Sequence, residues 1–206
     1  MRAATLVRDG LPFVASNADL TVPTAYGLAP GHGVLVRTIT GFAGVDAVIA
    51  GKPEKPLMEE TVLRVGGDRP LMVGDRLDTD IEGAHAIDVP SLLVLTGVTW
   101  LDELAAAPPR LRPTYVSPTM DGLFETHPVA AVSDDAAELG GWTARIDEGR
   151  LTVSGAGSDA DWWRVAVAAC WRHLDDTGSP ADVSDTAPPG PARARPGPQR
   201  RVGSRP

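Results

Sequence analysis

The sequence predicts an α/β fold built around a parallel sheet. Two short apolar runs, Val45–Ala50 and Leu71–Val73, are predicted strands because each ends in a loop that leads into a segment with helical character. A third run, Val89–Leu95, follows the second helical segment in the same way. Strands and helices that alternate in this order form βαβ units. Ligands bind such sheets beyond the carboxyl ends of the strands, so we expect a functional site there.

A polar loop at Ser16–Thr24 follows a further predicted strand at Leu11–Ala15. Its asparagine, aspartate and threonine side chains suit ligand binding, but the same residue types commonly satisfy the backbone of their own turn. From the residues alone both interpretations stay open, and hydrogen bonding within the loop is favoured over ligand binding. Helices are predicted on either side, one within residues 1–10 and one that begins near Pro30 and ends at Gly41 or Gly44.

Charged side chains follow two of the predicted strands. Lys52 comes after the first run, and Asp75 and Asp80 come after the second. Taken singly, each has a plain interpretation as a solvated lysine or a helix-entry acid. Together they suit a phosphate and Mg²⁺: Asp75 would supply a ligand, Asp80 would hold a metal-bound water and Lys52 would neutralise a phosphoryl group. If the two strands are neighbours, Lys52 should point toward Asp75.

The helix after this second loop begins with a capping-box pattern. Thr79 and Glu82 stand three residues apart, as in Ser/Thr-x-x-Glu. We therefore expect the Thr79 hydroxyl to accept an orphan backbone amide while the Glu82 side chain reaches back.

The C-terminal third has a different pattern. Residues 141–147 and 150–154 alternate around Asp147-Glu148-Gly149, which predicts a β-hairpin. Residues 159–176 predict an amphipathic helix whose apolar face carries Cys170, so we expect an inert, buried thiol. From Gly178 onward Pro, Gly, Ala and Arg dominate, and this predicts a disordered tail that is dispensable for folding.

Composition narrows the possible partners. The net charge is −8, although residues 178–206 carry five arginines against two aspartates, so nucleic acid is not expected. No apolar run reaches the roughly 18–20 residues that would span a bilayer, and because no long apolar stretch lies before Asp9 we do not expect residues 1–8 to act as a signal peptide. The single cysteine excludes an internal disulfide and favours the cytoplasm.

The order of these segments resembles a known family. Gly51-Lys52-Pro53 and the segment Val73–Ile81 closely resemble motifs three and four of the haloacid dehalogenase (HAD) superfamily. The most similar subfamily, type IIA, contains p-nitrophenyl-, phosphoglycolate and pyridoxal phosphate phosphatases. Short segments between Ser16 and Gly33 resemble the end of its α/β cap domain, and Pro90–Thr99 also fits. The resemblance covers roughly residues 5–125.

This resemblance implies a Rossmann-like HAD core that is only partly present. Residues 1–44 would be the C-terminal remnant of the cap, and residues 45–125 the C-terminal half of the core. Residues 126–177 would form a hairpin-plus-helix appendage, followed by the Pro/Arg-rich tail at 178–206.

The resemblance also implies roles for individual residues. Enzymes of the family hydrolyse phosphomonoesters of small metabolites with Mg²⁺, through an aspartate nucleophile that forms an aspartyl-phosphate. Carried over by motif, Lys52 and Asp80 would be catalytic and Asp75 the metal ligand. The substrate loop of the cap would contain Asn17, Asp19 and Pro23.

One family motif has no counterpart. The nucleophile motif, an Asp-x-Asp after a strand, lies upstream of the cap in the family; here Asp78–Asp80 lies inside motif four and Asp159–Asp161 opens a helix. We therefore expect the C-terminal part of a phosphatase, inactive alone, whose implied partner is a separately encoded N-terminal half. The alternative is a non-catalytic remnant, or a module that binds phosphate and metal.

Overall fold

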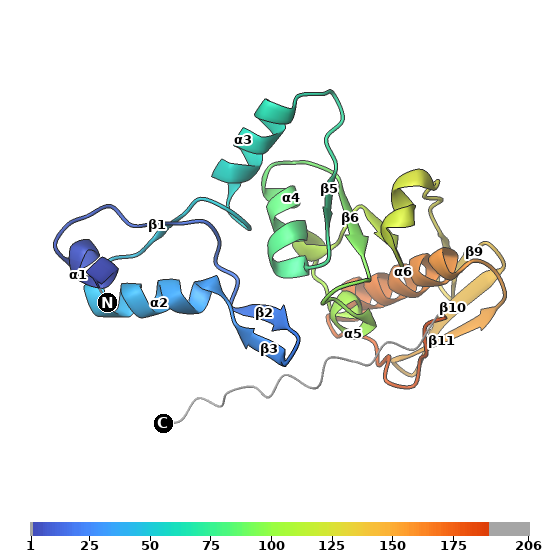
Figure 1. The fold of residues 1–206 in the computed structure, drawn as a ribbon. Helices are drawn as coiled ribbons and strands as arrows, with labels where there is room; N and C mark the ends of the chain where they lie inside the picture. The colour runs from blue at the N-terminus through green and yellow to red at the C-terminus, as the bar shows by residue number, and fades with distance from the viewer. Residues whose placement is uncertain (1, 190–206) are drawn as a thin grey trace.

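The computed structural model describes residues 2–189 and has the predicted α/β architecture (Figure 1). Helices α1 and α2, strand β1 and the β2–β3 hairpin lie to one side, helix α3 lies at the top, and helix α5 and strands β9, β10 and β11 lie against helix α6. Within residues 2–189 no helix is long and apolar enough to cross a membrane.

The N-terminal part combines two helices with four short strands. Helix α1 (Arg2–Arg8) packs against α2 (His32–Ala43), which ends at Gly44 in the left-handed conformation. Between the helices lies a hairpin that was not predicted: β2 (Thr21–Thr24) forms the end of the predicted polar loop, and β3 (Gly27–Pro30) follows it. The remaining strands are β1 (Val14–Ala15) and β4 (Val48–Ile49).

Strand β4 does not lie beside the strand that precedes Asp75, so the expected pairing was wrong. It runs parallel to β1, and the Val48 amide donates to the Phe13 carbonyl at 2.8 Å. Val48 is 63% exposed, although a nearly continuous apolar run is typical of strands that are covered on both faces. The composition of an apolar run indicates that it forms a strand, but which strand it pairs with depends on residues far away in the chain.

The central part is a parallel sheet of order β5–β6–β7. Its strands are Met72–Gly74, Ser91–Val94 and Tyr115–Ser117. Helix α3 (Lys55–Val65) precedes the sheet and packs on α4 (Glu82–Ala86) through the buried Met58. The central part also contains a π-helical turn at Leu77–Ile81, helix α5 (Leu101–Ala105) and two 3₁₀ turns (Pro109–Leu111 and Met120–Phe124).

The C-terminal part is larger than the predicted hairpin and helix. Its antiparallel sheet has four strands: β8 (Ala131–Val132), β9 (Ala137–Leu139), β10 (Trp142–Asp147) and β11 (Arg150–Gly155). The predicted hairpin is confirmed as β10–β11, and its turn residues Glu148 and Gly149 both have positive φ, as a type I′ turn requires. The predicted helix is confirmed as α6 (Asp159–Thr177).

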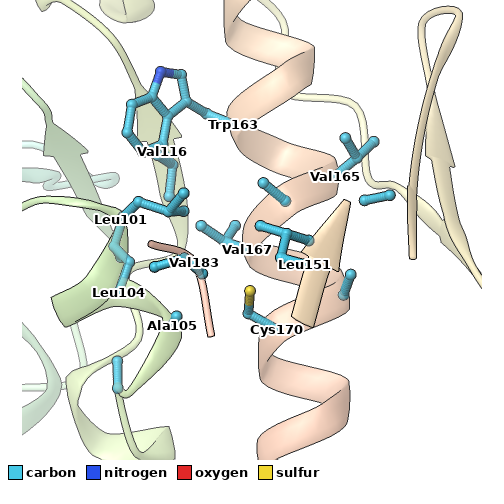
Figure 2. Close-up of a cluster of buried hydrophobic side chains, with 14 of the residues drawn as sticks. Leu101, Leu104, Ala105, Val116, Leu151, Trp163, Val165, Val167, Cys170 and Val183 are labelled. Carbon is cyan, nitrogen blue, oxygen red and sulfur yellow. The ribbon is translucent and has the colours of Figure 1, made fainter. Parts of the chain in front are cut away.

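Helix α6 joins the two sheets into one core. Figure 2 shows Leu104 and Val116 on one side of the helix and Leu151, from β11, on the other. Val165 and Cys170 on α6 have no exposed surface, which confirms the buried thiol. All members of this cluster within residues 2–189 lie between Leu77 and Val183.

The segment from Gly178 to Pro189 docks on this core, so the prediction that the tail begins at Gly178 was wrong. Ala181 and Val183 are 7% and 6% exposed, and the Leu151 amide donates to the Asp182 carbonyl at 2.9 Å. Two isolated apolar residues among polar ones leave no periodicity to detect. Residues 190–206 of the predicted tail lie outside the described residues.

Candidate active site at the strand ends

Loops that follow the parallel strands carry the predicted site residues. Lys52 comes after β4, Asp75 and Asp80 come after β5, and the segment Thr96–Thr99 comes after β6. Two different parallel sheets therefore contribute to one location. This is the strand-end position at which α/β proteins bind ligands.

Asp80 brings the two predicted loops together. Its Oδ1 lies 2.6 Å from Nζ of Lys52, and its Oδ2 accepts the backbone amides of Asp75 and Arg76 at 3.1 and 3.2 Å. Asp80 is 3% exposed, so the lysine balances a buried carboxylate. The direct partner of Lys52 is thus Asp80 and not Asp75, toward which this lysine was predicted to point.

Asp75 lies at the carboxyl end of β5 with one carboxylate oxygen fixed. Its Oδ2 accepts the Val98 amide at 2.9 Å, whereas Oδ1 takes no hydrogen bond from residues 2–189. A Cβ at Gly97 would overlap this carboxylate, so any larger residue there would force the Asp75 side chain to move. Asp75 is therefore positioned to offer an oxygen to a cation.

The expected capping box is absent, so that prediction was wrong. Thr79 lies inside the π-helical turn Leu77–Ile81, and its buried hydroxyl has no hydrogen-bond partner in the described part of the chain. The chain turns into the helix before Thr79, which removes this residue from the N-cap position. The Asp80 carboxylate accepts the amides of Asp75 and Arg76 at the start of the turn instead.

The three predicted substrate-loop residues lie in different surroundings. Asn17 accepts the Asp19 amide through its own side chain at 3.1 Å, which matches the local interpretation of the loop. Pro23 is exposed on strand β2, opposite Leu28. Asp19 is half-buried, and its Oδ1 has no partner among residues 2–189. Of the three, Asp19 lines a cavity next to the site.

This cavity, about 630 Å³ in volume, separates the β2–β3 region from the central sheet and α5. We call it the junction cavity. Arg76 lines part of it. Its guanidinium donates two hydrogen bonds to Asp78, at 3.0 and 2.8 Å, and its Nη1 lies 3.5 Å from the Thr21 hydroxyl. Hydrogen bonding to Asp78, with smaller contributions from the charges of Asp19 and Asp75, raises the pKa of Arg76 above its ordinary value.

Several residues of this cavity were not predicted. Arg76 could have been found, because it stands within the motif that contains Asp75 and Asp80. Others come from separate elements and had no local signal: Arg37, Thr99 and Glu103. Glu103 reaches the surface, yet partial desolvation raises its pKa, with additional effects of the Asp102 and Asp78 charges.

Comparison with known proteins agrees with this geometry. The family described as "HAD-hyrolase-like" matches residues 49–123, which include Lys52, Asp75 and Asp80. The solved structure of glycerol phosphate phosphatase from Mycobacterium tuberculosis in complex with magnesium superimposes with a TM-score of 0.69 at 39% identity, covering 82% of this chain and 51% of that one. The chain belongs to the HAD superfamily. This confirms the resemblance found in the sequence, and the relatives fit the type IIA subfamily.

Two curated relatives of this HAD protein have different named activities. D-glycerol 3-phosphate phosphatase of M. tuberculosis is 42% identical over 159 residues, which are 77% of this chain and 44% of the relative. The 5′-nucleotidase YutF of Bacillus subtilis is 42% identical over 95 residues, 45% of this chain and 37% of the relative. The chain therefore spans less than half the length of these two relatives.

Proposed function

We propose that this chain supplies the lysine, the metal ligand and the supporting acid of a magnesium-dependent phosphomonoesterase site. The observation that carries the proposal is the shared carboxylate of Asp80, which joins Lys52 to the loop that bears Asp75. An ammonium group and a metal ligand at one strand edge can neutralise the charge that develops on a transferring phosphoryl group. Small phosphorylated metabolites are the proposed substrates, as the names of the relatives suggest.

The oxygen ligands at this site suit a Mg²⁺ ion that takes only part of its coordination shell from the protein. Within residues 2–189 no three His, Cys, Asp or Glu side chains converge as a cage. Mg²⁺ commonly uses one or two carboxylates together with waters and substrate phosphate, and Oδ1 of Asp75 can provide one such oxygen. When bound, the ion would withdraw electron density from a phosphate oxygen. Lys52, which the ion pair with Asp80 holds in place, would bind the phosphate beside the metal ion.

We further propose that turnover needs a nucleophile-bearing segment in addition to the residues of this chain. These residues contain no Asp-x-Asp directly after a strand, and they span only part of the length of the relatives. Lys52, Asp75 and Asp80 provide electrostatic stabilisation, but aspartyl-phosphate chemistry also requires a nucleophile. The cytoplasm is the proposed location, given the single cysteine.

Titration calorimetry of the pure chain with inorganic phosphate in MgCl₂ tests the first proposal. We expect saturable binding that is lost in Lys52→Met and in Asp75→Asn and retained in Glu60→Gln, a surface control on α3. Absence of binding to the unmodified chain would refute the site.

Hydrolysis of p-nitrophenyl phosphate tests the second proposal. We expect no turnover by the chain alone. Magnesium-dependent turnover that disappears in Asp75→Asn would show that the chain is sufficient for catalysis and would overturn the need for a further segment. Phosphate binding without turnover, even with a segment bearing an Asp-x-Asp motif added, would favour the alternative of a phosphate- and metal-binding module.

A further inference from the structure

A second large cavity lies where the central sheet meets the C-terminal part. Its volume is about 580 Å³, and its lining comes from the segments that follow β6 and β7, from α5 and α6, and from the docked segment 183–189. We call it the tryptophan cavity because Trp100 and Trp163 both line it. It shares no lining residue with the junction cavity, and a cavity of this size accommodates a small organic molecule.

The charged side chains that line this cavity within residues 2–189 are all acidic: Asp102, Asp159 and Asp185. Asp185 is balanced by Arg150, whose Nη1 lies 2.6 Å from its carboxylate. The carboxylates of Asp102 and Asp159 accept no hydrogen bond from the described part of the chain. The lining therefore carries two unbalanced negative charges, which favour a cationic ligand over an anionic one.

The acids alone do not establish a binding site. Asp102 and Asp159 each lie in the first turn of a helix, α5 and α6 respectively, where the helix dipole stabilises a carboxylate. An independent observation is needed, and the two tryptophans supply it.

Trp163 has an unsatisfied polar group. The residue is 3% exposed, yet its indole N–H makes no hydrogen bond with residues 2–189. Figure 2 shows the indole nitrogen on the side of the ring that points away from Leu101 and Val167. A buried tryptophan usually finds a partner for this N–H, and leaving it unpaired costs free energy. On a residue that lines a cavity, the unpaired N–H indicates a ligand with a hydrogen-bond acceptor.

Trp100 adds a second, half-buried indole to the cavity. Its ring centroid lies 6.5 Å from that of Trp163, with 45° between the ring planes. The face of a tryptophan attracts organic cations. A guanidinium group suits this lining better than an ammonium group, because its plane stacks on an aromatic ring while its edge donates paired hydrogen bonds to a carboxylate. Leu95, Leu101 and Pro118 offer apolar contacts for an alkyl chain.

We propose that the tryptophan cavity binds an alkylguanidinium group on a body that carries a carbonyl, as in an arginine derivative. The guanidinium group would lie against Trp100 and pair with Asp102 or Asp159. The carbonyl oxygen would accept the Trp163 N–H. This inference needs no bound phosphate or metal, so it is independent of the proposed function.

The chain itself contains one source of this chemistry. Pro189 lines the cavity, and the residues that follow it in the sequence, 190–206, contain no acidic residue. They contain five arginines: Arg193, Arg195, Arg200, Arg201 and Arg205. A free arginine derivative is the other source. A full-length variant in which glutamine replaces these five arginines distinguishes the two.

Calorimetry with two matched probes tests the proposal. One probe is N-acetyl-arginine N-methylamide, and the other is the citrulline analogue, which has the same shape but a neutral urea group. We expect the five-glutamine variant to bind the arginine probe saturably and roughly tenfold or more tightly than the citrulline probe. Added NaCl should weaken this binding by screening. Tighter binding to the variant than to the unmodified chain would identify the chain's own arginines as competitors, whereas equal binding would identify a free derivative as the ligand.

Substitutions in the five-glutamine variant assign the binding to named groups. Asp102→Asn and Asp159→Asn alter exposed carboxylates, so both are expected to fold, and each should weaken binding of the arginine probe severalfold. Trp100→Leu removes an aromatic face and should weaken it roughly tenfold. Asp68→Asn is the matched control, because it makes the same charge change at an exposed acid outside the cavity and should leave the affinity unaltered.

Three outcomes would overturn the inference. The first is no saturable binding of the arginine probe to the unmodified chain or to the five-glutamine variant. The second is equal affinity for the arginine and citrulline probes. The third is an affinity that the combined Asp102→Asn and Asp159→Asn changes leave unaltered. Phosphate binding at Lys52 and Asp75 is measured separately, so each proposal can fail while the other stands.

Discussion

Lys52 and Asp80 are 28 residues apart in the chain, yet Nζ and Oδ1 lie 2.6 Å apart. This ion pair crosses from the β1–β4 sheet to the β5–β6–β7 sheet. The Asp80 carboxylate is almost fully buried, whereas the Lys52 side chain is 37% exposed. The pair therefore holds the candidate site together across two sheets that share no strand.

Replacing Asp80 should destabilise the fold as well as the site. Asp80→Asn keeps the shape but removes the charge that faces Lys52. If its one oxygen accepts the Asp75 and Arg76 amides, its NH2 group faces the Lys52 ammonium, and two donors then meet. We expect a loss of about 2–3 kcal/mol in the free energy of unfolding, measured by urea denaturation. Glu60→Gln, which alters an exposed helix pair, should cost under about 0.5 kcal/mol. Equal effects of the two changes would contradict this role of Asp80.

Adding a methyl group at Gly97 should disturb the metal ligand. In Gly97→Ala the new Cβ would overlap the Asp75 carboxylate, so that side chain must move. We expect the Mg²⁺ affinity, measured by calorimetry in the presence of phosphate, to fall roughly tenfold, about 1.4 kcal/mol. Gly41→Ala is the matched control, because that position in α2 has no atom near the added carbon. It should bind as the unmodified chain does and gain roughly 0.5–1 kcal/mol of stability.

The docked segment 178–189 should contribute to stability. Val183 is buried in the shared core, so Val183→Ala should cost about 1–3 kcal/mol. Deleting residues 178–206 should lower the melting temperature by several degrees, whereas deleting only 190–206 remains predicted to have little effect. Calorimetric melting of the two truncated chains decides this, and identical melting temperatures would contradict the docking.

The single cysteine allows a test of the core at alkaline pH. Burial raises the pKa of Cys170 from 9.0 to about 12. Between these values the unfolded chain releases the proton and the folded chain retains it, so stability falls as pH rises. The slope is about 1.4 kcal/mol per pH unit above pH 9. Thiol labelling at pH 8 should be negligible until the protein unfolds, and rapid labelling of the native protein would contradict burial.

Several local signals in the sequence were reliable, although the capping-box pattern at Thr79 and Glu82 was not. Gly44 marks the end of α2 because it adopts the left-handed conformation that favours glycine, and Gly178, which was predicted only as the start of the tail, ends α6 in the same way. The Glu148-Gly149 turn specified the β10–β11 hairpin for the same reason. These features depend on the conformational preferences of a few neighbouring residues, which the sequence displays directly.

Features that depend on distant partners were missed. The run at Val45–Ala50 indicated a strand but carried no information that β1 would be its neighbour. The Lys52–Asp80 pair was expected only in outline, because motif spacing places both residues at strand ends without selecting which carboxylate meets the ammonium group. The junction cavity was not foreseen, since its lining is assembled from several separate elements.

The position of the buried core in the chain predicts which backbone segments open first. The large cluster begins at Leu77, and within the described chain no earlier residue belongs to it. Several earlier apolar side chains are exposed by half or more, among them Val14, Leu35, Val48 and Leu63. Backbone amides before β5 should therefore exchange with deuterium through partial opening, at a lower free energy than global unfolding requires. Amides of α6 should exchange last. Lys52 would belong to the early-opening segment and Asp80 to the late one, so each opening event would take the candidate site apart while the core stays folded.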